Sequence, residues 1–203
     1  LRLGAGRMIR RGRDAGAKGL PKTPVKWEVL EHDARCVRMR CEDELRQDAA
    51  VYAYEMLREV RLEDAGLVSV TTLRLRVPWS HPVSWFAHPF FAQSDGDATG
   101  FEIPGQPVAT GTFTCDENGW YRLPPQGGLA SLVNLWGETR PIMVHLDPAT
   151  GAGQVEISLD RPMDHVVLYA SRSAASPEPQ LVRGWKDREQ ASWRICYGMD
   201  MGR

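Results

Sequence analysis

The sequence lacks the long apolar runs that membrane proteins need. No stretch approaches the roughly 20 apolar residues of a membrane-spanning helix, and we expect no secretory signal. It also lacks an excess of charge of either sign, since 25 lysines and arginines face 26 aspartates and glutamates. We therefore expect a cytoplasmic protein that binds neither nucleic acid nor a membrane.

Cysteine and histidine are scarce, and their spacing excludes the common metal-binding motifs. The four cysteines form no CxxC pair, and the five histidines form no HxH or HExxH pattern. We expect no metal site, and we interpret the cysteines as small apolar side chains in a reducing compartment. They are Cys36, Cys41, Cys115 and Cys196.

Short alternating segments separated by turn residues dominate what is present. Such strands at a spacing of roughly 8–12 residues are typical of a β-sandwich or barrel. A chain of 203 residues suits one all-β domain over residues 1–203. The predicted strands cover 26–31, 35–41, 67–77, 108–115, 120–123, 141–146, 154–159, 165–170 and 192–197.

The segment 43–61 is ambiguous. It contains no glycine or proline and many good helix formers, so propensity alone favours a helix. Residues 51–62 also alternate, and the turn Asp64-Ala65-Gly66 connects them to the strand over 67–77. We favour a pair of strands, partly because of the resemblance described below.

One stretch, residues 83–92, concentrates residues that could carry chemistry. His88 stands directly before Pro89, with Trp85 and Phe90 close by in the sequence. A titratable imidazole between aromatic side chains fits an acid that acts on a sugar ring. The alternative is a histidine that only packs at a strand end.

The order of features along the chain resembles the aldose 1-epimerase (galactose mutarotase-like) family. The segment 82–91, PVSWFAHPFF, is similar to the family's histidine signature, and Glu178-Pro179 follows the strand 166–169 as its Glu-Pro pair does. The match covers about residues 19–200. It implies an all-β fold, a large twisted antiparallel β-sandwich that is shortened at its N-terminus, with a sugar cleft on one sheet.

The resemblance also implies an activity, the interconversion of the α and β anomers of a free aldose. His88 would be the general acid and Glu178 the general base, with Trp85 and Phe90 stacking on the sugar. Ring opening by these two groups needs no cofactor. We expect a small-molecule sugar as the partner of a monomer or homodimer. For Glu178 the alternative is an exposed acid in a Ser/Pro/Glu loop over 171–180.

Two positions depart from the family's pattern. The substrate-binding histidine of the family corresponds to Lys18, and its substrate-binding aspartate corresponds to Asn134. An ammonium group is a compact point charge, and an amide binds hydroxyl groups without a charge. The substitutions put galactose specificity in doubt and leave both residues as candidate substrate ligands.

Three alternatives to a free-aldose epimerase stay open. A hexose-6-phosphate 1-epimerase shares the histidine signature and would use basic residues such as Arg10, Arg11 or Arg13. A non-catalytic carbohydrate-binding module would keep the cleft without the chemistry. A β-sandwich interaction domain would have no sugar site at all.

Overall fold

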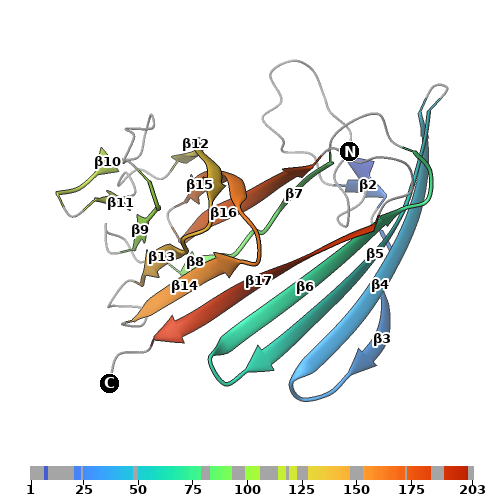
Figure 1. Cartoon of the computed structure of the whole chain (residues 1–203), viewed down its shortest axis with the longest axis horizontal. Helices are drawn as coiled ribbons and strands as arrows, with labels where there is room; N and C mark the ends of the chain where they lie inside the picture. The colour runs from blue at the N-terminus through green and yellow to red at the C-terminus, as the bar shows by residue number, and fades with distance from the viewer. Residues whose placement is uncertain are drawn as a thin grey trace. The chain divides into compact units, whose positions relative to one another are not determined.

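The computed structural model of the chain is built from β-strands (Figure 1). It describes residues 7–8, 21–23, 25–47, 50–78, 83–92, 99–105, 114–117, 119–122, 128–146, 153–171, 173–183 and 190–200. Within these ranges every regular element is a strand, and no helix has the length and apolar character that crossing a membrane demands. The predicted all-β, antiparallel class is confirmed.

The chain divides into two compact units, each of which is described by itself. Unit 1 comprises Leu1–Arg61, Ser69–Pro82 and Gly184–Ser192, and unit 2 comprises Leu62–Val68, Val83–Arg183 and Trp193–Arg203. The expectation of one domain over residues 1–203 stays a prediction.

Unit 1 contains a run of hydrogen-bonded antiparallel strands in the order β6-β5-β4-β3. The pair of strands predicted over 51–62 and 67–77 is therefore confirmed as β5 and β6, and the helix over 43–61 is excluded. Propensity was overridden because each strand finds a partner along its whole length, from Cys36↔Arg61 to Gln47↔Ala50. The bounds are β3 Glu28–His32, β4 Cys36–Gln47, β5 Ala50–Glu63 and β6 Gly66–Leu75, with a separate pair β1 Arg7–Met8 and β2 Pro21–Thr23.

The two faces of these strands differ in polarity. One face carries the buried side chains Cys41, Tyr54, Met56, Leu73 and Leu75. The other carries exposed ion pairs, including Arg40–Glu28 at 2.8 Å and Arg76–Glu42 at 2.7 Å. Exposed pairs of this kind contribute about 0–1 kcal/mol each, so burial of the apolar face is the larger source of stability.

Unit 2 contains two antiparallel sheets. One has the order β10-β11-β9-β13-β14-β17, and the other has the order β12-β15-β16-β7, with the short β8 also paired to β16. The first comprises β9 Gly100–Glu102, β10 Thr114–Cys115, β11 Trp120–Arg122, β13 Ile142–His145, β14 Gln154–Leu159 and β17 Gln190–Asp200. The second comprises β7 Val83–Phe86, β8 Phe91–Ala92, β12 Gly128–Glu138, β15 Met163–Ala170 and β16 Ala174–Arg183.

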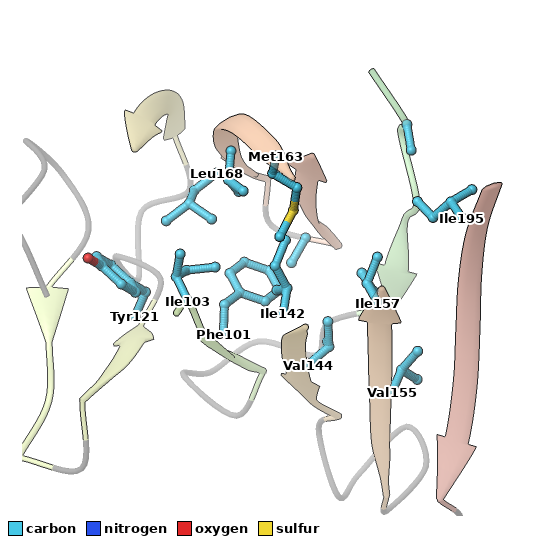
Figure 2. Packing of buried hydrophobic residues seen from close by; sticks show 13 residues of the cluster. Phe101, Ile103, Tyr121, Ile142, Val144, Val155, Ile157, Met163, Leu168 and Ile195 are labelled. Carbon is cyan, nitrogen blue, oxygen red and sulfur yellow. The ribbon is translucent and has the colours of Figure 1, made fainter. Parts of the chain in front are cut away.

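The core of unit 2 lies between these two sheets (Figure 2). Phe101, Ile142 and Ile157 project from the first sheet, and Met163 and Leu168 approach them from the second. All five are at most 1% exposed. Full burial of such side chains stabilises the fold by about 1.5–3 kcal/mol each, which makes this cluster the structural support of the second sheet.

Two sequence expectations in unit 2 were wrong. β12 covers residues 128–138, for which the sequence pattern indicated no strand. Residues 171–180, expected as a loop, contribute residues 174–180 to β16. Prolines 177 and 179 suggested a loop because proline has no N–H to donate. Both are nevertheless registered opposite residues of β15, and the Pro179 carbonyl accepts a hydrogen bond from the Ala87 amide at 3.2 Å.

The β5–β6 turn yields the first prediction. Gly66 has φ +142°, and a Cβ atom there would lie 2.0 Å from the backbone oxygen of Tyr197. We expect Gly66→Ala to lower the free energy of unfolding by more than about 2 kcal/mol, because strain and a backbone clash combine. Urea denaturation followed by tryptophan fluorescence measures the change.

Gly198→Ala is the matched control, because its Cβ would meet nothing nearer than Glu156 Cβ at 3.7 Å. We expect that variant to unfold within about 1 kcal/mol of the wild type. Equal destabilisation of the two variants would contradict the close approach at Gly66.

Cysteine reactivity provides a second prediction. Cys41 is 2% exposed, and burial raises the pKa of its thiol to about 12. Roughly one Cys41 side chain in 10⁴ is then ionised at pH 8, and the thiolate is the reactive form. We expect Cys41 to resist iodoacetamide in the folded protein and to react after denaturation, as mass spectrometry would detect. Modification of Cys41 as fast as that of the partly exposed Cys196 would contradict this.

Candidate active site

Three neighbouring strands of the second sheet of unit 2 position the candidate active site. β16 lies between β15 and β7, with Glu178 opposite Val167 and Gln180 opposite Phe86. A tight turn joins β15 to β16, where the Ser171 hydroxyl accepts a hydrogen bond from the Ala174 amide at 3.1 Å. The turn connects the two strands, and their register determines which side chains share a face.

Alternation divides these strands into a core face and a second face, which we call the site face. Val166 and Leu168 of β15 are fully buried in the core between the sheets. Their neighbours Val167 and Tyr169, with Glu178 of β16, therefore point to the site face. The packing of the core thus orients the side chains of the site.

The central contact of the site joins His88 to Glu178. His88 lies two residues after Phe86, the last residue of β7, and its Nδ1 lies 2.6 Å from Oε1 of Glu178. The carboxylate side chain is 9% exposed, whereas the imidazole side chain is 47% exposed. A buried carboxylate needs a hydrogen-bond donor or a positive partner, and an Nδ1–H group supplies one. The pair therefore combines a protected carboxylate with an accessible imidazole.

Aromatic rings surround the imidazole on the site face. The ring centroid of Phe90 lies 4.5 Å from that of His88, and those of Phe86 and Tyr169 lie 5.7 Å and 6.4 Å away. Tyr169 is edge-on to both His88 and Phe90. Phe90 is 57% exposed, so an apolar surface borders the accessible side of the imidazole. This arrangement suits the apolar face of a sugar ring.

The structure brings together only some of the site residues proposed from the sequence. His88, Glu178 and Phe90 are brought together. Trp85 lies opposite Leu181, and its ring packs edge-on against Trp193, with centroids 5.3 Å apart. Asn134 lies on β12, where it is registered opposite His165. Lys18 and the arginines at 10, 11 and 13 lie outside the described residues.

The sequence pattern indicated neither Phe86 nor Tyr169 as a member of the site, and it offered a loop as the setting of Glu178. Glu178 lies on a strand and is 7% exposed, so the alternative of an exposed loop acid is wrong. Phe86 and Tyr169 went unnoticed because aromatic residues in strands usually belong to the core. The period of two in 165–169 indicates only that Tyr169 lies on the face opposite to Val166 and Leu168.

Comparison with known proteins connects the fold to one group of structures. No family model matches the sequence, and no curated protein matches it at significant similarity. A candidate aldose 1-epimerase from Escherichia coli K12 superimposes with a TM-score of 0.63 at 12% identity, over 98% of this chain and 80% of that chain. A galactose mutarotase-like protein from Lactobacillus casei gives 0.67 at 11% identity, over 97% and 83%.

A third structure, a galactose mutarotase-like protein from Clostridium acetobutylicum, gives a TM-score of 0.57 at 12% identity, over 99% of this chain and 75% of that one. The chain therefore has the galactose mutarotase-like fold, as the resemblance implied. At these identities the likeness concerns the fold, and the chemistry has to be argued from the site.

The unequal burial of the two partners leads to a prediction about stability. His88→Ala leaves the buried carboxylate without its imidazole, and we expect a loss of about 1–3 kcal/mol in the free energy of unfolding. Glu178→Gln leaves an accessible imidazole that water can hydrate and removes a buried charge, so we expect a change of less than about 1 kcal/mol. Urea denaturation at pH 7.5 measures both values.

The double variant His88→Ala/Glu178→Gln is the control for this asymmetry. It removes the charge together with its partner, so we expect it to recover most of the stability that His88→Ala loses. A larger loss in Glu178→Gln than in His88→Ala would show that the carboxylate has a structural role.

Proposed function

We propose that the protein is an isomerase that interconverts the α and β anomers of a free aldose. The observation that carries this proposal is the contact of 2.6 Å between the accessible His88 imidazole and the buried Glu178 carboxylate. Two proton-transfer groups side by side suit a reaction that removes one proton and delivers another within a single sugar ring. The galactose mutarotase-like fold and the aromatic surface at Phe90 support the same conclusion.

The reaction needs one base and one acid. Glu178 accepts the proton of the C1 hydroxyl as the bond between C1 and the ring oxygen breaks, and protonated His88 delivers a proton to that oxygen. The product is the open-chain aldehyde, with Glu178 protonated and His88 neutral. Rotation about the C1–C2 bond exposes the other face of the carbonyl group, and the reverse transfers close the ring as the second anomer.

The direct contact has a consequence for the resting enzyme. The contact places the carboxylate and the imidazole side by side before a sugar binds, so that one group can accept a proton while the other delivers one. The acid is the more accessible group, because the His88 side chain is 47% exposed and the Glu178 side chain is 9% exposed.

A test of the proposal follows anomer exchange directly. Freshly dissolved α-galactose, α-glucose and glucose 6-phosphate are monitored by polarimetry and NMR exchange spectroscopy, with and without protein. We expect acceleration with at least one free aldose. His88→Asn and Glu178→Gln should each reduce it by about 10²–10⁴-fold, the usual contribution of one positioned proton transfer. A preference for glucose 6-phosphate would indicate the hexose-6-phosphate epimerase instead.

His32→Asn and Glu156→Gln are the matched controls, because both residues are exposed on strands that carry no part of the site. We expect wild-type rates from both. Full activity in either His88→Asn or Glu178→Gln would overturn the assignment of that residue.

A second candidate function is a non-catalytic carbohydrate-binding module. The exposure of the Phe90 ring favours it, because stacking on a sugar needs no proton transfer. Calorimetry separates the two candidates. Sugar binding without anomer exchange would support the module, whereas exchange that depends on His88 and Glu178 would support the enzyme.

We also propose a cytoplasmic location and a small-molecule sugar as the partner. All four cysteines are free thiols, which suits a reducing compartment.

A further inference from the structure

One row of residues crosses four strands beside the catalytic pair. Asn134 on β12 is registered opposite His165 on β15, and His165 is registered opposite Gln180 on β16. Gln180 in turn is registered opposite Phe86 on β7. Directly opposed residues in antiparallel strands place their side chains on the same face. The row therefore brings His165 and Gln180 to the face that also carries Phe86.

Alternation along each strand identifies this face as the site face. Gln180 follows Glu178 by two residues, and His165 precedes Val167, the partner of Glu178, by two. Residues two apart in a strand point to the same side. Val166 and Leu181, which alternate with this set, are buried on the other side, whereas His165 and Gln180 are each partly exposed.

Strand geometry places the row within reach of a sugar held at the catalytic pair. Gln180 lies two residues from Glu178, which corresponds to about 6–7 Å along the strand. His165 lies diagonally across from Glu178, at about 7–8 Å between the Cα atoms. A hexose has similar dimensions, so a ring whose C1 lies at Glu178 extends its other hydroxyl groups toward this row.

The chemistry of the row indicates the class of group that it binds. The Gln180 amide and the His165 imidazole each offer a donor and an acceptor without requiring a charge. Hydroxyl groups also donate and accept, so the two sides are complementary. A phosphate group is instead bound by an arginine that donates two hydrogen bonds or by several cationic side chains together. The row therefore fits a neutral aldose.

We propose that His165 and Gln180 bind the hydroxyl groups of a neutral aldose beyond C1 and so determine which aldose the site accepts. This inference rests on the proposed function. It adds a polar half to the site, opposite the aromatic half formed by Phe90 and Tyr169.

The test combines kinetics with binding in four variants. His165→Ala and Gln180→Ala should each raise KM and weaken Kd for the preferred aldose roughly 3- to 10-fold, the effect of losing one hydrogen bond. The ratio of kcat/KM between galactose and glucose should change, while kcat should change far less than in Glu178→Gln. His32→Ala and Gln190→Ala, both at exposed positions on other strands, should leave every value unchanged.

The outcomes separate this inference from the proposed function. Unchanged KM, Kd and galactose/glucose ratio in both site variants, with exchange still abolished by Glu178→Gln, would overturn the role of the row alone. Sugar binding without exchange in the wild type, lost in His165→Ala and Gln180→Ala, would support the row and overturn the catalytic function. A wild type that neither binds nor exchanges would overturn both.

Folding controls complete the design. Thermal unfolding of each variant is measured, and Gln180→Glu serves as a second variant of nearly the same size. We expect it to lose affinity for the neutral aldose at an unchanged Tm, because a carboxylate cannot donate a hydrogen bond. Losses that are equal for galactose and glucose and that accompany a lowered Tm would mean that the row is structural.

Discussion

The contact between Glu178 and His88 is the interaction on which the candidate site depends. A carboxylate side chain that is 9% exposed in a central strand is unfavourable unless a donor faces it, and His88, two residues after the end of β7 at Phe86, supplies that donor. Neither residue alone is unusual. Together they place the carboxylate of Glu178 at a buried position where an apolar side chain would stabilise the fold at least as well. A buried charged pair of this kind indicates a role in function rather than in stability.

The packing of the core determines the geometry of the contact between His88 and Glu178. Val166, Leu168 and Ala175 are fully buried against the opposing sheet, and any slip of β15 or β16 by one residue would expose them. The apolar face therefore fixes the register of strands whose other face carries the chemistry. The two faces of the second sheet therefore have different roles. The core face holds the strands in place by hydrophobic burial, and the site face carries the polar and aromatic residues of the site.

The likeness to galactose mutarotase-like structures extends over nearly the whole chain at 11–12% identity. Such a relationship preserves the arrangement of strands while most side chains change. The alignment of Lys18 and Asn134 with the family's substrate-binding histidine and aspartate stays a prediction from the sequence. The row through His165 and Gln180 offers a different set of hydrogen-bonding groups on the same sheet.

The sequence by itself determined the all-β class, most of the long strands and the candidate pair, because alternation, turn residues and two short signatures are local features. It did not determine that residues 174–183 form a strand, since prolines 177 and 179 indicate a loop until a neighbouring strand supplies a ladder. Nor did it place Tyr169, His165 and Gln180 beside Glu178. Those relations depend on cross-strand register, which is set by the packing of Val166 and Leu168 against distant strands. Only the tertiary structure contains that information, because register is a property of pairs of strands and not of any one segment.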